Sequence, residues 1–420
     1  MISQKDIPNH WDIKRIEDVV LEAKNGGTPK RSNDDYWGGS VPWLSSSEVR
    51  GKYTTSDPEE YITQTGLKES SAVYWSKGSV LVAMYGRGTI GRSAIAGADI
   101  TGNQAICGLV CDDEMINNDF LYYWLTSIRN QLADKGRGAT ASRQNLNRRL
   151  ILETKVPVPP LGEQEQIVEV VEKRLKRMER LKKSVGDISR LTQEYENSLL
   201  TFLTIGKDVT DKTAVGGIPK QQDLPDEWDV VQLSKVADVN PRISYDEQED
   251  YAYVPMDAVS ADEKTITRYE RRESLYSGLA KFSEGDIIVA RITPCFENGK
   301  MAVVSELPSG YEFAVGSTEF VVIRPDGIDP EYLFSYLKSP IVRRWGERRL
   351  LGSTGRERIK ISQFRDELSV PVPPKETQSD ITQAIKENDF SKIRTSVISV
   401  QSMFEEYENS VLANATRGNI

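Results

Sequence analysis

The heptapeptides EYENSLL (residues 194–200) and EYENSVL (residues 406–412) are nearly identical and lie 212 positions apart in a chain of 420 residues. Seven residues can recur by chance, so the surrounding sequence has to be compared as well. VPVPP at residues 156–160 recurs unchanged at residues 370–374, and IPNHWDI at residues 7–13 corresponds to LPDEWDV at residues 224–230. The chain is therefore a tandem duplication whose period suits a whole domain plus a connector, far longer than a solenoid repeat.

The first part of each copy, residues 1–155 and 208–370, is predicted to be an α+β globular domain. SVLVAMY (79–85) and DIIVARI (286–292) are predicted strands that each enter a bend with Gly or Pro, and AICGLV (105–110) and EFVVIRP (319–325) are predicted further strands. Apolar residues at helical spacing around 120–130 and 332–345 predict helices.

The second part of each copy, residues 156–207 and 371–420, is predicted to be a long helix. The VPVPP segment before it has to be extended, because proline lacks an N–H and disfavours the helical region for its predecessor. After the prolines, apolar residues follow a 3-4-3-4 spacing that is typical of a coiled-coil seam, interrupted in the first copy by Thr192 and weakened at Gly186. The predicted seam residues are Met178, Leu181, Val185, Ile188, Tyr195 and Leu199, and Phe390, Ile393, Val397, Val400, Phe404, Tyr407 and Val411.

The long helices need a partner for this stripe, and each helix is the obvious partner of the other. The repeated EYENS segments then place Tyr195 and Tyr407 at equivalent seam positions. The alternative is that each helix folds back on its own domain, although a two-position stripe is narrow for a globular face. An antiparallel pair would relate the two copies by a pseudo-two-fold axis, which matches the dyad symmetry of duplex DNA.

Composition indicates a cytoplasmic protein without membrane spans. No apolar run approaches the length that crosses a bilayer, and three cysteines suggest a reducing compartment. Cys107 and Cys111 are predicted to be buried, inert thiols, because a single histidine (His10) leaves a zinc site short of ligands. No metal site is predicted.

The net charge of -9 argues at first against nucleic acid, but the charge is unevenly distributed. Residues 208–370 hold 21 basic and 29 acidic side chains and so carry most of the acidic excess. Basic runs nevertheless occur at matching places, residues 135–155 and 338–360. A charge run is usually a solvated face, but two runs at equivalent positions favour a binding site.

Candidate DNA contacts lie in these runs, in the two bends and in the Gly- and Ser-rich segment 26–49. Arginine suits guanine and asparagine suits adenine in the major groove, and hydroxyls and guanidiniums position phosphates. Trp37 and Trp43 are predicted to serve packing rather than base stacking. The candidates are Lys30, Arg31, Arg87, Arg92, Asn103, Gln104, Arg137, Thr140, Arg143, Asn145, Arg291, Asn298, Lys300, Arg343, Arg344, Ser353, Thr354, Arg356 and Arg358.

The two variable domains, each followed by VPVPP and then PLGEQEQIV or PKETQSDIT, make the chain resemble the DNA-specificity subunit of a type I restriction-modification system. The second copy lacks the Leu-Gly and the Glu-Gln pair but keeps Gln378 and Ile381. The resemblance implies two α/β target-recognition domains, an antiparallel coiled coil that sets the spacer of a bipartite target, and a subunit without catalysis. It also implies two methyltransferase subunits carrying S-adenosylmethionine, and restriction subunits that use ATP and Mg.

The residues give no independent support for catalysis in this chain. The only Pro-Pro pairs occur in VPPL and VPPK, so the Asp/Asn-Pro-Pro-aromatic loop of an adenine methyltransferase is absent, as is a Gly-Lys-Ser/Thr phosphate loop. GRGTIG (86–91) matches a dinucleotide fingerprint, but the next residues resume a β pattern, which favours a hairpin or loop. We therefore expect no catalytic residues and no cofactor.

Two alternatives remain open at the level of sequence. One is the specificity portion of a fused or type II-like methyltransferase or nuclease system. The other is an interaction scaffold that does not bind DNA, in which the basic runs are solvated surfaces.

Overall fold

The computed structural model describes residues 2–86, 88–136, 146–205, 218–245, 249–261, 265–352 and 355–419. Its contacts divide the chain into two compact units. Unit 1 consists of Met1–Ser184 with Val400–Ile420, and unit 2 consists of Val185–Ser399. Among the described residues, no helix is both long and apolar enough to span a membrane.

Unit 1 contains three small sheets and a helical layer. One sheet has the strand order β2-β8-β5-β6, the second has the order β4-β3-β7, and the third is the ribbon β1-β9. The strands are β1 (Asp12–Arg15), β2 (Val20–Asn25), β3 (Trp37–Leu44), β4 (Glu60–Ile62), β5 (Val80–Ala83), β6 (Ser93–Ile95), β7 (Thr101–Gly102), β8 (Ile106–Cys111) and β9 (Lys155–Val158). The helices are α1 (Gln64–Lys68), α2 (Asn118–Ser127), α3 (Arg129–Lys135), α4 (Arg148–Leu152) and the start of α5 (Leu161–Ile205).

Unit 2 repeats this arrangement, except that its second sheet has four strands where that of unit 1 has three. Its sheets have the orders β11-β18-β15-β16, β13-β12-β17-β14 and β10-β19. The strands are β10 (Asp229–Gln232), β11 (Ala237–Val239), β12 (Tyr251–Val254), β13 (Glu270–Arg272), β14 (Ala280–Phe282), β15 (Ile287–Ala290), β16 (Met301–Val303), β17 (Ala314–Gly316), β18 (Phe320–Pro325) and β19 (Ser369–Val372). The helices are α6 (Pro330–Lys338), α7 (Pro340–Glu347), α8 (Ile361–Glu367), α9 (Lys375–Glu387) and α10 (Ser391–Ala415), whose end belongs to unit 1.

The duplication predicted from the sequence is confirmed by this topology. In both units the second sheet contains one parallel pair, β3 with β7 and β12 with β17, among antiparallel neighbours. The predicted strands and helices around 79–85, 286–292, 105–110, 319–325, 120–130 and 332–345 are also found, as β5, β15, β8, β18, α2 with α3, and α6 with α7.

The VPVPP segments are extended, as predicted, and each pairs with the repeated segment near the start of its copy. Ile13 lies opposite Pro157, and Val230 lies opposite Pro371, in antiparallel ribbons. A two-stranded ribbon consists of edge strands, where a residue without an N–H is tolerated. The two most similar segments of each copy therefore form one structural element.

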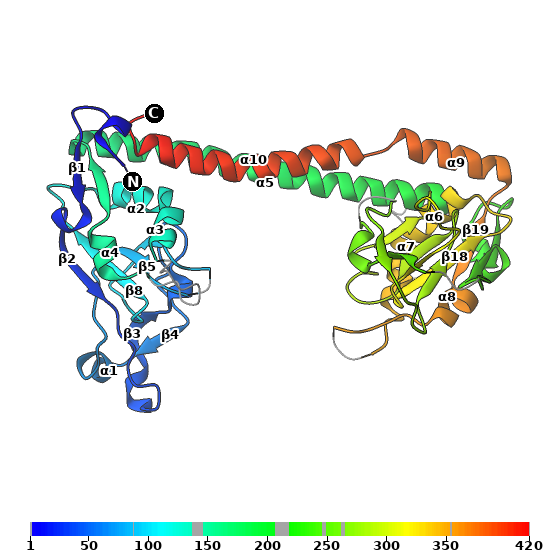
Figure 1. Ribbon diagram of the computed structural model, residues 1–420, viewed down its shortest axis with the longest axis horizontal. Helices are drawn as coiled ribbons and strands as arrows, with labels where there is room; N and C mark the ends of the chain where they lie inside the picture. The colour runs from blue at the N-terminus through cyan, green and yellow to red at the C-terminus, as the bar shows by residue number, and fades with distance from the viewer. Residues whose placement is uncertain are drawn as a thin grey trace. The chain divides into compact units, whose positions relative to one another are not determined.

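The core of each unit lies between the first sheet and the helix that follows it. In unit 1, Phe120 and Trp124 of α2 are buried against the sheet that holds β5 and β8 (Figure 1). In unit 2, Tyr332 and Tyr336 of α6 occupy the equivalent place. Cys107 and Cys111 are buried in the unit 1 core, and this burial raises the pKa of both thiols to about 12.

The long helices contact each other in both units. In unit 1, Lys182 of α5 pairs with Glu408 of α10 at 3.1 Å, while Leu412 joins the same core as Val171. In unit 2, Glu196 pairs with Arg394 at 2.6 Å, and the ring centroids of Tyr195 and Phe390 are 5.5 Å apart. From Lys182 back to Val171 along α5, the residues of α10 beside it advance from Glu408 to Leu412. The two helices therefore run antiparallel in unit 1.

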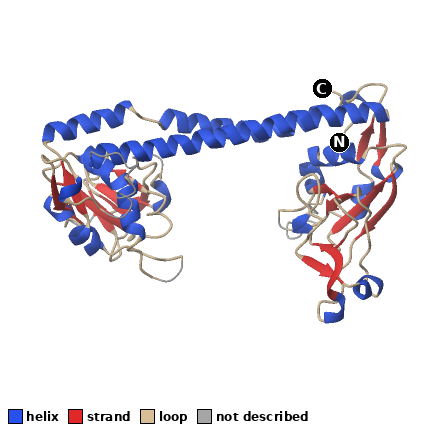
Figure 2. Cartoon of the chain, turned by 180° about the vertical axis from the view of Figure 1, so that it is seen from behind, coloured by secondary structure: helices blue, strands red, loops and turns tan. Residues whose placement is uncertain are grey.

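The second copy differs from the prediction of a single helix in residues 371–420, because α9 and α10 are separated by a non-helical link at residues 388–390 (Figure 2). Met178 lies 22 positions after Val156, whereas Phe390 lies only 20 positions after Val370. Two missing residues turn a helical stripe by about 200° at 3.6 residues per turn. The link lets the apolar stripe of α10 face α5 again. Asp389 caps the start of α10 by accepting a 2.9 Å hydrogen bond from the N–H of Ser391.

Candidate nucleic-acid interface

In unit 2 the bend after β15 and the basic segment before α8 form one surface. The N–H of Ile359 donates to the carbonyl of Arg291 over 2.9 Å, and the N–H of Thr293 donates to the carbonyl of Glu357 over 3.0 Å. Backbone bonds therefore join segments that lie more than sixty positions apart in the sequence. The structure brings the predicted residues Arg291, Arg356 and Arg358 into one region.

Helix α7 completes this surface from the other side. Gly299 has a φ of +72°, and a Cβ there would lie 3.1 Å from Nη2 of Arg343. The guanidinium therefore lies directly against the bend. Arg343 and Arg344 are both half-buried. A positive φ and this close contact together explain why glycine occupies position 299.

Several predicted DNA-binding side chains of unit 2 make contacts within the protein. Arg291 donates to the carbonyls of Ile359 and Thr318, each over 3.3 Å, and lies 3.4 Å from Glu319. Lys300 donates to the carbonyl of Met256 over 3.1 Å. Arg291 and Lys300 thus shape the bend, whereas Asn298 and Arg356 are exposed on it.

Buried polar atoms without a hydrogen-bond partner are concentrated around this surface. Within the described part of the chain nine such side-chain atoms occur, and seven of them belong to residues 291–345. An unsatisfied buried polar group costs about 1–3 kcal/mol, so such atoms call for water or a ligand. The seven are Arg291 Nε, Thr293 Oγ1, Glu297 Oε2, Glu319 Oε2, Ser339 Oγ, Arg344 Nη2 and Trp345 Nε1.

The bend of unit 1 has the same construction. The N–H of Leu146 donates to the carbonyl of Met84 over 2.9 Å, which joins the bend to the segment before α4. Gly86, Gly88 and Gly91 have φ values of +124°, +78° and +73° and form a turn that leads into β6. The described residues of GRGTIG therefore lie in a turn between β5 and β6, as predicted, and do not open a helix.

An arginine that the sequence analysis did not select lies at this bend. Nη2 of Arg129, at the start of α3, donates to the carbonyl of Gly88 over 2.9 Å. Burial lowers the pKa of Arg129, and the neighbouring positive charge of Arg92 lowers it further. In the second copy the guanidinium of Arg343 lies beside Gly299 of the corresponding bend. The sequence signal for Arg129 was present: SIRN (127–130) and SPIVRR (339–344) each carry arginine shortly after a serine.

The candidates Lys30, Arg31, Asn103 and Gln104 lie beside the second sheet of unit 1. The guanidinium of Arg31 is 3.8 Å from the ring centroid of Trp37 and 4.9 Å from that of Trp43, and it forms an ion pair with Glu60. The hydrogen bond with Glu60 raises the pKa of Arg31. Oδ1 of Asn103 accepts from the N–H of Ala105, and Gln104 accepts from Thr28.

The tryptophans hold that segment together. Nε1 of Trp43 donates to the carbonyl of Gly27 over 3.0 Å, and Trp43 is buried. The prediction that Trp37 and Trp43 serve packing agrees with these contacts. Lys30 is exposed. The other candidates, Arg87, Arg137, Thr140, Arg143, Asn145, Ser353 and Thr354, lie outside the described residues.

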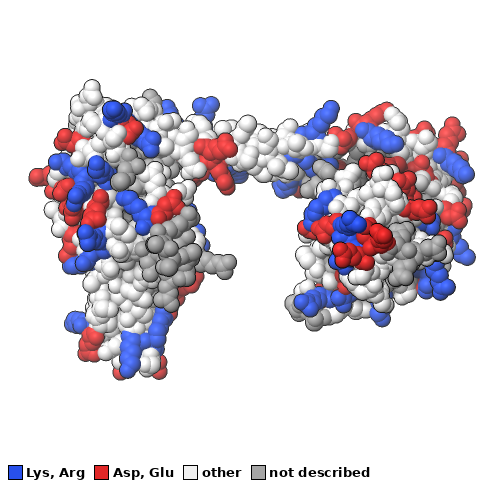
Figure 3. Space-filling view, viewed as in Figure 1, with Lys and Arg blue, Asp and Glu red and all other residues white. Residues whose placement is uncertain are grey.

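Charge on the visible face is mixed in unit 2, where acidic and basic side chains alternate (Figure 3). An internally neutralised surface attracts phosphate weakly. Acidic and basic side chains are mixed on the visible face of unit 1 as well. Within unit 1, Arg92 and Arg129 have no ion pair among the described residues.

The predicted seam residues differ in burial. Met178 and Val411 are buried, and Val185, Leu199, Phe390, Val397 and Phe404 are half-buried. The remaining six, Leu181, Ile188, Tyr195, Ile393, Val400 and Tyr407, are between 36% and 55% exposed.

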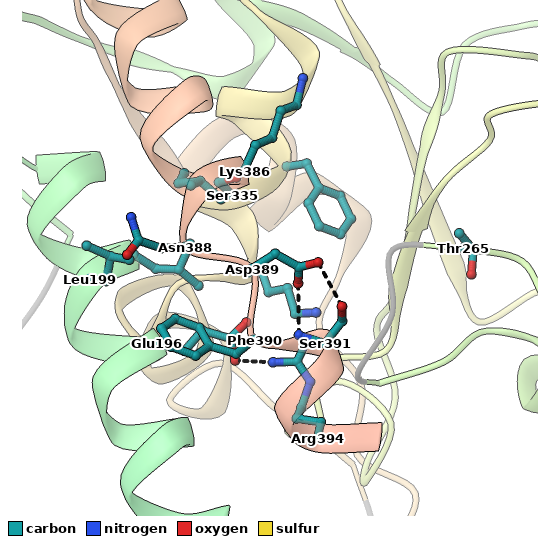
Figure 4. A pocket seen from close by; sticks show the side chains of 14 residues that line it. Glu196, Leu199, Thr265, Ser335, Lys386, Asn388, Asp389, Phe390, Ser391 and Arg394 are labelled. Atoms are coloured by element: carbon teal, nitrogen blue, oxygen red, sulfur yellow. Dashed lines mark hydrogen bonds and ion pairs between the residues drawn. The ribbon is translucent and has the colours of Figure 1, made fainter. Parts of the chain in front are cut away.

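A cavity of about 490 Å³ lies in unit 2 where α9 gives way to α10. Leu199 and Glu196 of α5 face Phe390, Ser391 and Arg394 across it (Figure 4). Only seam residues among the predicted sites line this cavity, so it belongs to the helix pair and not to the surface around the bends.

Comparison with known proteins gives one consistent family. Residues 8–185 and 225–395 match the model of the type I restriction modification DNA specificity domain. The type I restriction enzyme EcoAI specificity subunit of Escherichia coli is 35% identical over 167 residues, 39% of this chain and 28% of its own length. The MjaIX specificity subunit of Methanocaldococcus jannaschii is 26% identical over 249 residues, 58% of this chain and 56% of its own length.

Two solved structures share the fold over nearly the whole chain. A chain from a type I R-M system structure has a TM-score of 0.72 at 17% identity and covers 99% of both chains. The HsdS subunit from Thermoanaerobacter tengcongensis has a TM-score of 0.55 at 18% identity and covers 99% of this chain and 98% of its own. The matches to the first two curated relatives span less than a third of their length.

Proposed function

The chain belongs to the family defined by the type I restriction modification DNA specificity domain, which it contains twice, and from this we propose that it is the DNA-specificity subunit of a type I restriction-modification complex. Each unit would read one half of a bipartite duplex target. The subunit itself would catalyse nothing and would direct its partners to the site.

The observation that carries this proposal is the repeated bend with its arginine. In both units a bend between two strands of the first sheet is joined by backbone hydrogen bonds to a basic segment, and an arginine from the following helix lies against a bend glycine. Two equivalent bends, each with an arginine against it, on two diverged domains suit an asymmetric target with two halves.

We propose two methyltransferase subunits and restriction subunits as protein partners, with S-adenosylmethionine and ATP and Mg bound by those partners. The complex would act on DNA in the cytoplasm. The paired α5 and α10 would set the spacer between the half-sites through the seam residues. The alternative is a related fused or type II-like system that uses the same specificity portion.

A binding experiment with varied spacers tests the proposal. The subunit, reconstituted with its methyltransferase partners, is expected to select a bipartite motif from randomised duplexes, and lengthening the spacer by two or three base pairs should abolish tight binding. Equal affinity for every spacer would contradict the proposal. Methyl transfer to DNA by the isolated chain with labelled S-adenosylmethionine would instead favour the enzymatic alternative.

A second experiment concerns the helix pair. Inserting four residues, about one helical turn, into both α5 and α10 should shift the preferred spacer. An unchanged spacer would refute the role of the helices as a ruler while leaving DNA recognition by the two units intact.

A further inference from the structure

Arg358 of unit 2 has an unusually well supported backbone for a surface arginine. Its N–H donates to the carbonyl of Leu351 over 2.9 Å, and its carbonyl accepts from the N–H of Leu351 over 3.1 Å. It also bridges to Ile292 in the bend after β15. The Cα of Arg358 is therefore fixed from two sides.

The side chain of Arg358 is supported by Glu319, the residue directly before β18. Nη2 of Arg358 lies 2.8 Å from Oε1 of Glu319, and the Glu319 side chain is only 16% exposed. The other oxygen of Glu319 lies 3.4 Å from Nη2 of Arg291, which is itself anchored to two backbone carbonyls. The carboxylate therefore lies between the two guanidiniums, and its ion pair through Oε1 favours one direction for the Arg358 guanidinium, while Oε2 makes no hydrogen bond.

The outer edge of this guanidinium stays available. The Arg358 side chain is 47% exposed, and within the described part of the chain its only side-chain partner is Glu319. A guanidinium has five N–H donors in a planar fork. A half-exposed guanidinium with one ion pair therefore keeps donors for a ligand.

Neighbouring arginines lack this combination. Arg349 is only 30% exposed and is bound to Glu367 and to the carbonyl of Trp345. Arg356 is exposed on the same loop without an ion pair among the described residues. An exposed arginine without an ion pair suits a phosphate, whereas a fork held by an ion pair suits the paired acceptors O6 and N7 of guanine.

Resting on the proposed function, we infer that Arg358, aimed by Glu319, reads a guanine in the half-site bound by unit 2. Arg358 is the specificity-determining residue, and Glu319 is a positioning residue that acts through it. Holding the fork before binding reduces the side-chain entropy that recognition would otherwise cost.

The test uses the full chain assembled with its methyltransferase subunits and a library of randomised duplexes. The wild-type complex is expected to select duplexes that share a bipartite motif. If it selects no motif, both the proposed function and the role of Arg358 are wrong. With Arg358→Ala, one G·C position in one half-site should lose its preference by about 5- to 150-fold, while the other half-site keeps its sequence.

Three further variants separate reading from folding. Arg358→Lys should fail like Arg358→Ala, because an ammonium cannot form the bidentate contact. Glu319→Gln should weaken the preference at the same position only. Arg356→Ala should weaken binding uniformly across sequences and reduce the salt slope by about 1. Melting temperatures identify any variant that fails to fold.

Two results would overturn the inference. One is that Arg358→Ala and Arg358→Lys select the wild-type motif with unchanged preference at every position. The other is that Arg358→Ala lowers affinity equally for all sequences, which would make Arg358 a phosphate contact like Arg356. In both cases wild type still selects a bipartite motif, so the proposed function survives.

Discussion

Gln164 and Gln378 make matching hydrogen bonds in the two units. The side-chain oxygen of each accepts a 2.8 Å bond from a helix N-cap residue, Asn117 before α2 and Asp329 before α6. Each side-chain nitrogen donates over 2.8 Å to the carbonyl of the proline five positions earlier. Both side chains are buried, so this glutamine ties the helix after VPVPP to the domain helix of its own copy.

Replacing Gln164 by leucine should therefore lower the free energy of unfolding by about 2–3 kcal/mol, because the N–H of Asn117 and the carbonyls of Met115 and Pro159 would stay buried without a partner. Urea denaturation measures the effect. Gln166→Leu, at an exposed position on the same turn of α5, is the matched control and should change stability little. Equal losses for the two variants would show that the hydrogen bonds of Gln164 do not matter.

Arg92 and Arg129 are expected to contact DNA phosphates, since neither has an ion pair among the described residues and their charges repel each other. Each substitution by glutamine should weaken binding to all sequences and reduce the slope of log affinity against log salt by about 0.9. Filter binding over a salt series measures this slope. Arg190→Gln, which removes an exposed charge paired with Glu194 on α5, should leave the slope unchanged. An unaltered slope in Arg129→Gln would exclude Arg129 from the interface.

The ion pair between Glu196 and Arg394 should stabilise the contact of α5 with α10 in unit 2, because both side chains are only about one fifth exposed. A double-mutant cycle with alanine is expected to give a coupling of about 1 kcal/mol, against about 0.3–0.5 kcal/mol for the exposed pair Arg190 and Glu194 within α5. The charge-swapped variant Glu196→Arg with Arg394→Glu should recover part of the loss caused by either reversal alone. A zero coupling would show that this pair does not hold the helices together.

The buried thiols of Cys107 and Cys111 predict a pH dependence of stability. Their pKa is raised to about 12 in the folded chain, against about 8.5 in an unfolded one. Their contribution is therefore complete below about pH 8.5 and is lost as pH rises toward 12, by about 1.4 kcal/mol per pH unit for each thiol. Urea denaturation between pH 7.5 and 9.5 should show this loss, and it should be smaller in a Cys107→Ala, Cys111→Ala variant.

The same burial predicts thiol reactivity. At pH 8 a thiol reagent should modify Cys295 first, because its burial is only partial, and should reach Cys107 and Cys111 only after unfolding. Rapid modification of all three thiols in the native chain would contradict the structure of the unit 1 core.

Repetition in the sequence predicted most of the fold. The two VPVPP segments, the paired strands such as SVLVAMY and DIIVARI, and the spacing of Tyr195 and Tyr407 all depend on local periodicity, which a strand or helix imposes on nearby residues. The doubled topology and α5 follow from the same patterns. The unequal spacing from Val156 to Met178 and from Val370 to Phe390 was also visible, but its consequence, the link between α9 and α10, required the structure.

The sequence alone determined that this chain contains two copies of one domain and one long helical segment. Hydrophobic periodicity and repeated short segments are properties of neighbouring residues, so they can be seen without the fold. Only the tertiary structure decided which partner each cation of the two bends meets. Arg291 and Arg358 share Glu319, whereas Arg129 meets Gly88 near Arg92. These partners are distant in sequence, and a charge becomes available or neutralised only when folding places its partner within a few ångströms.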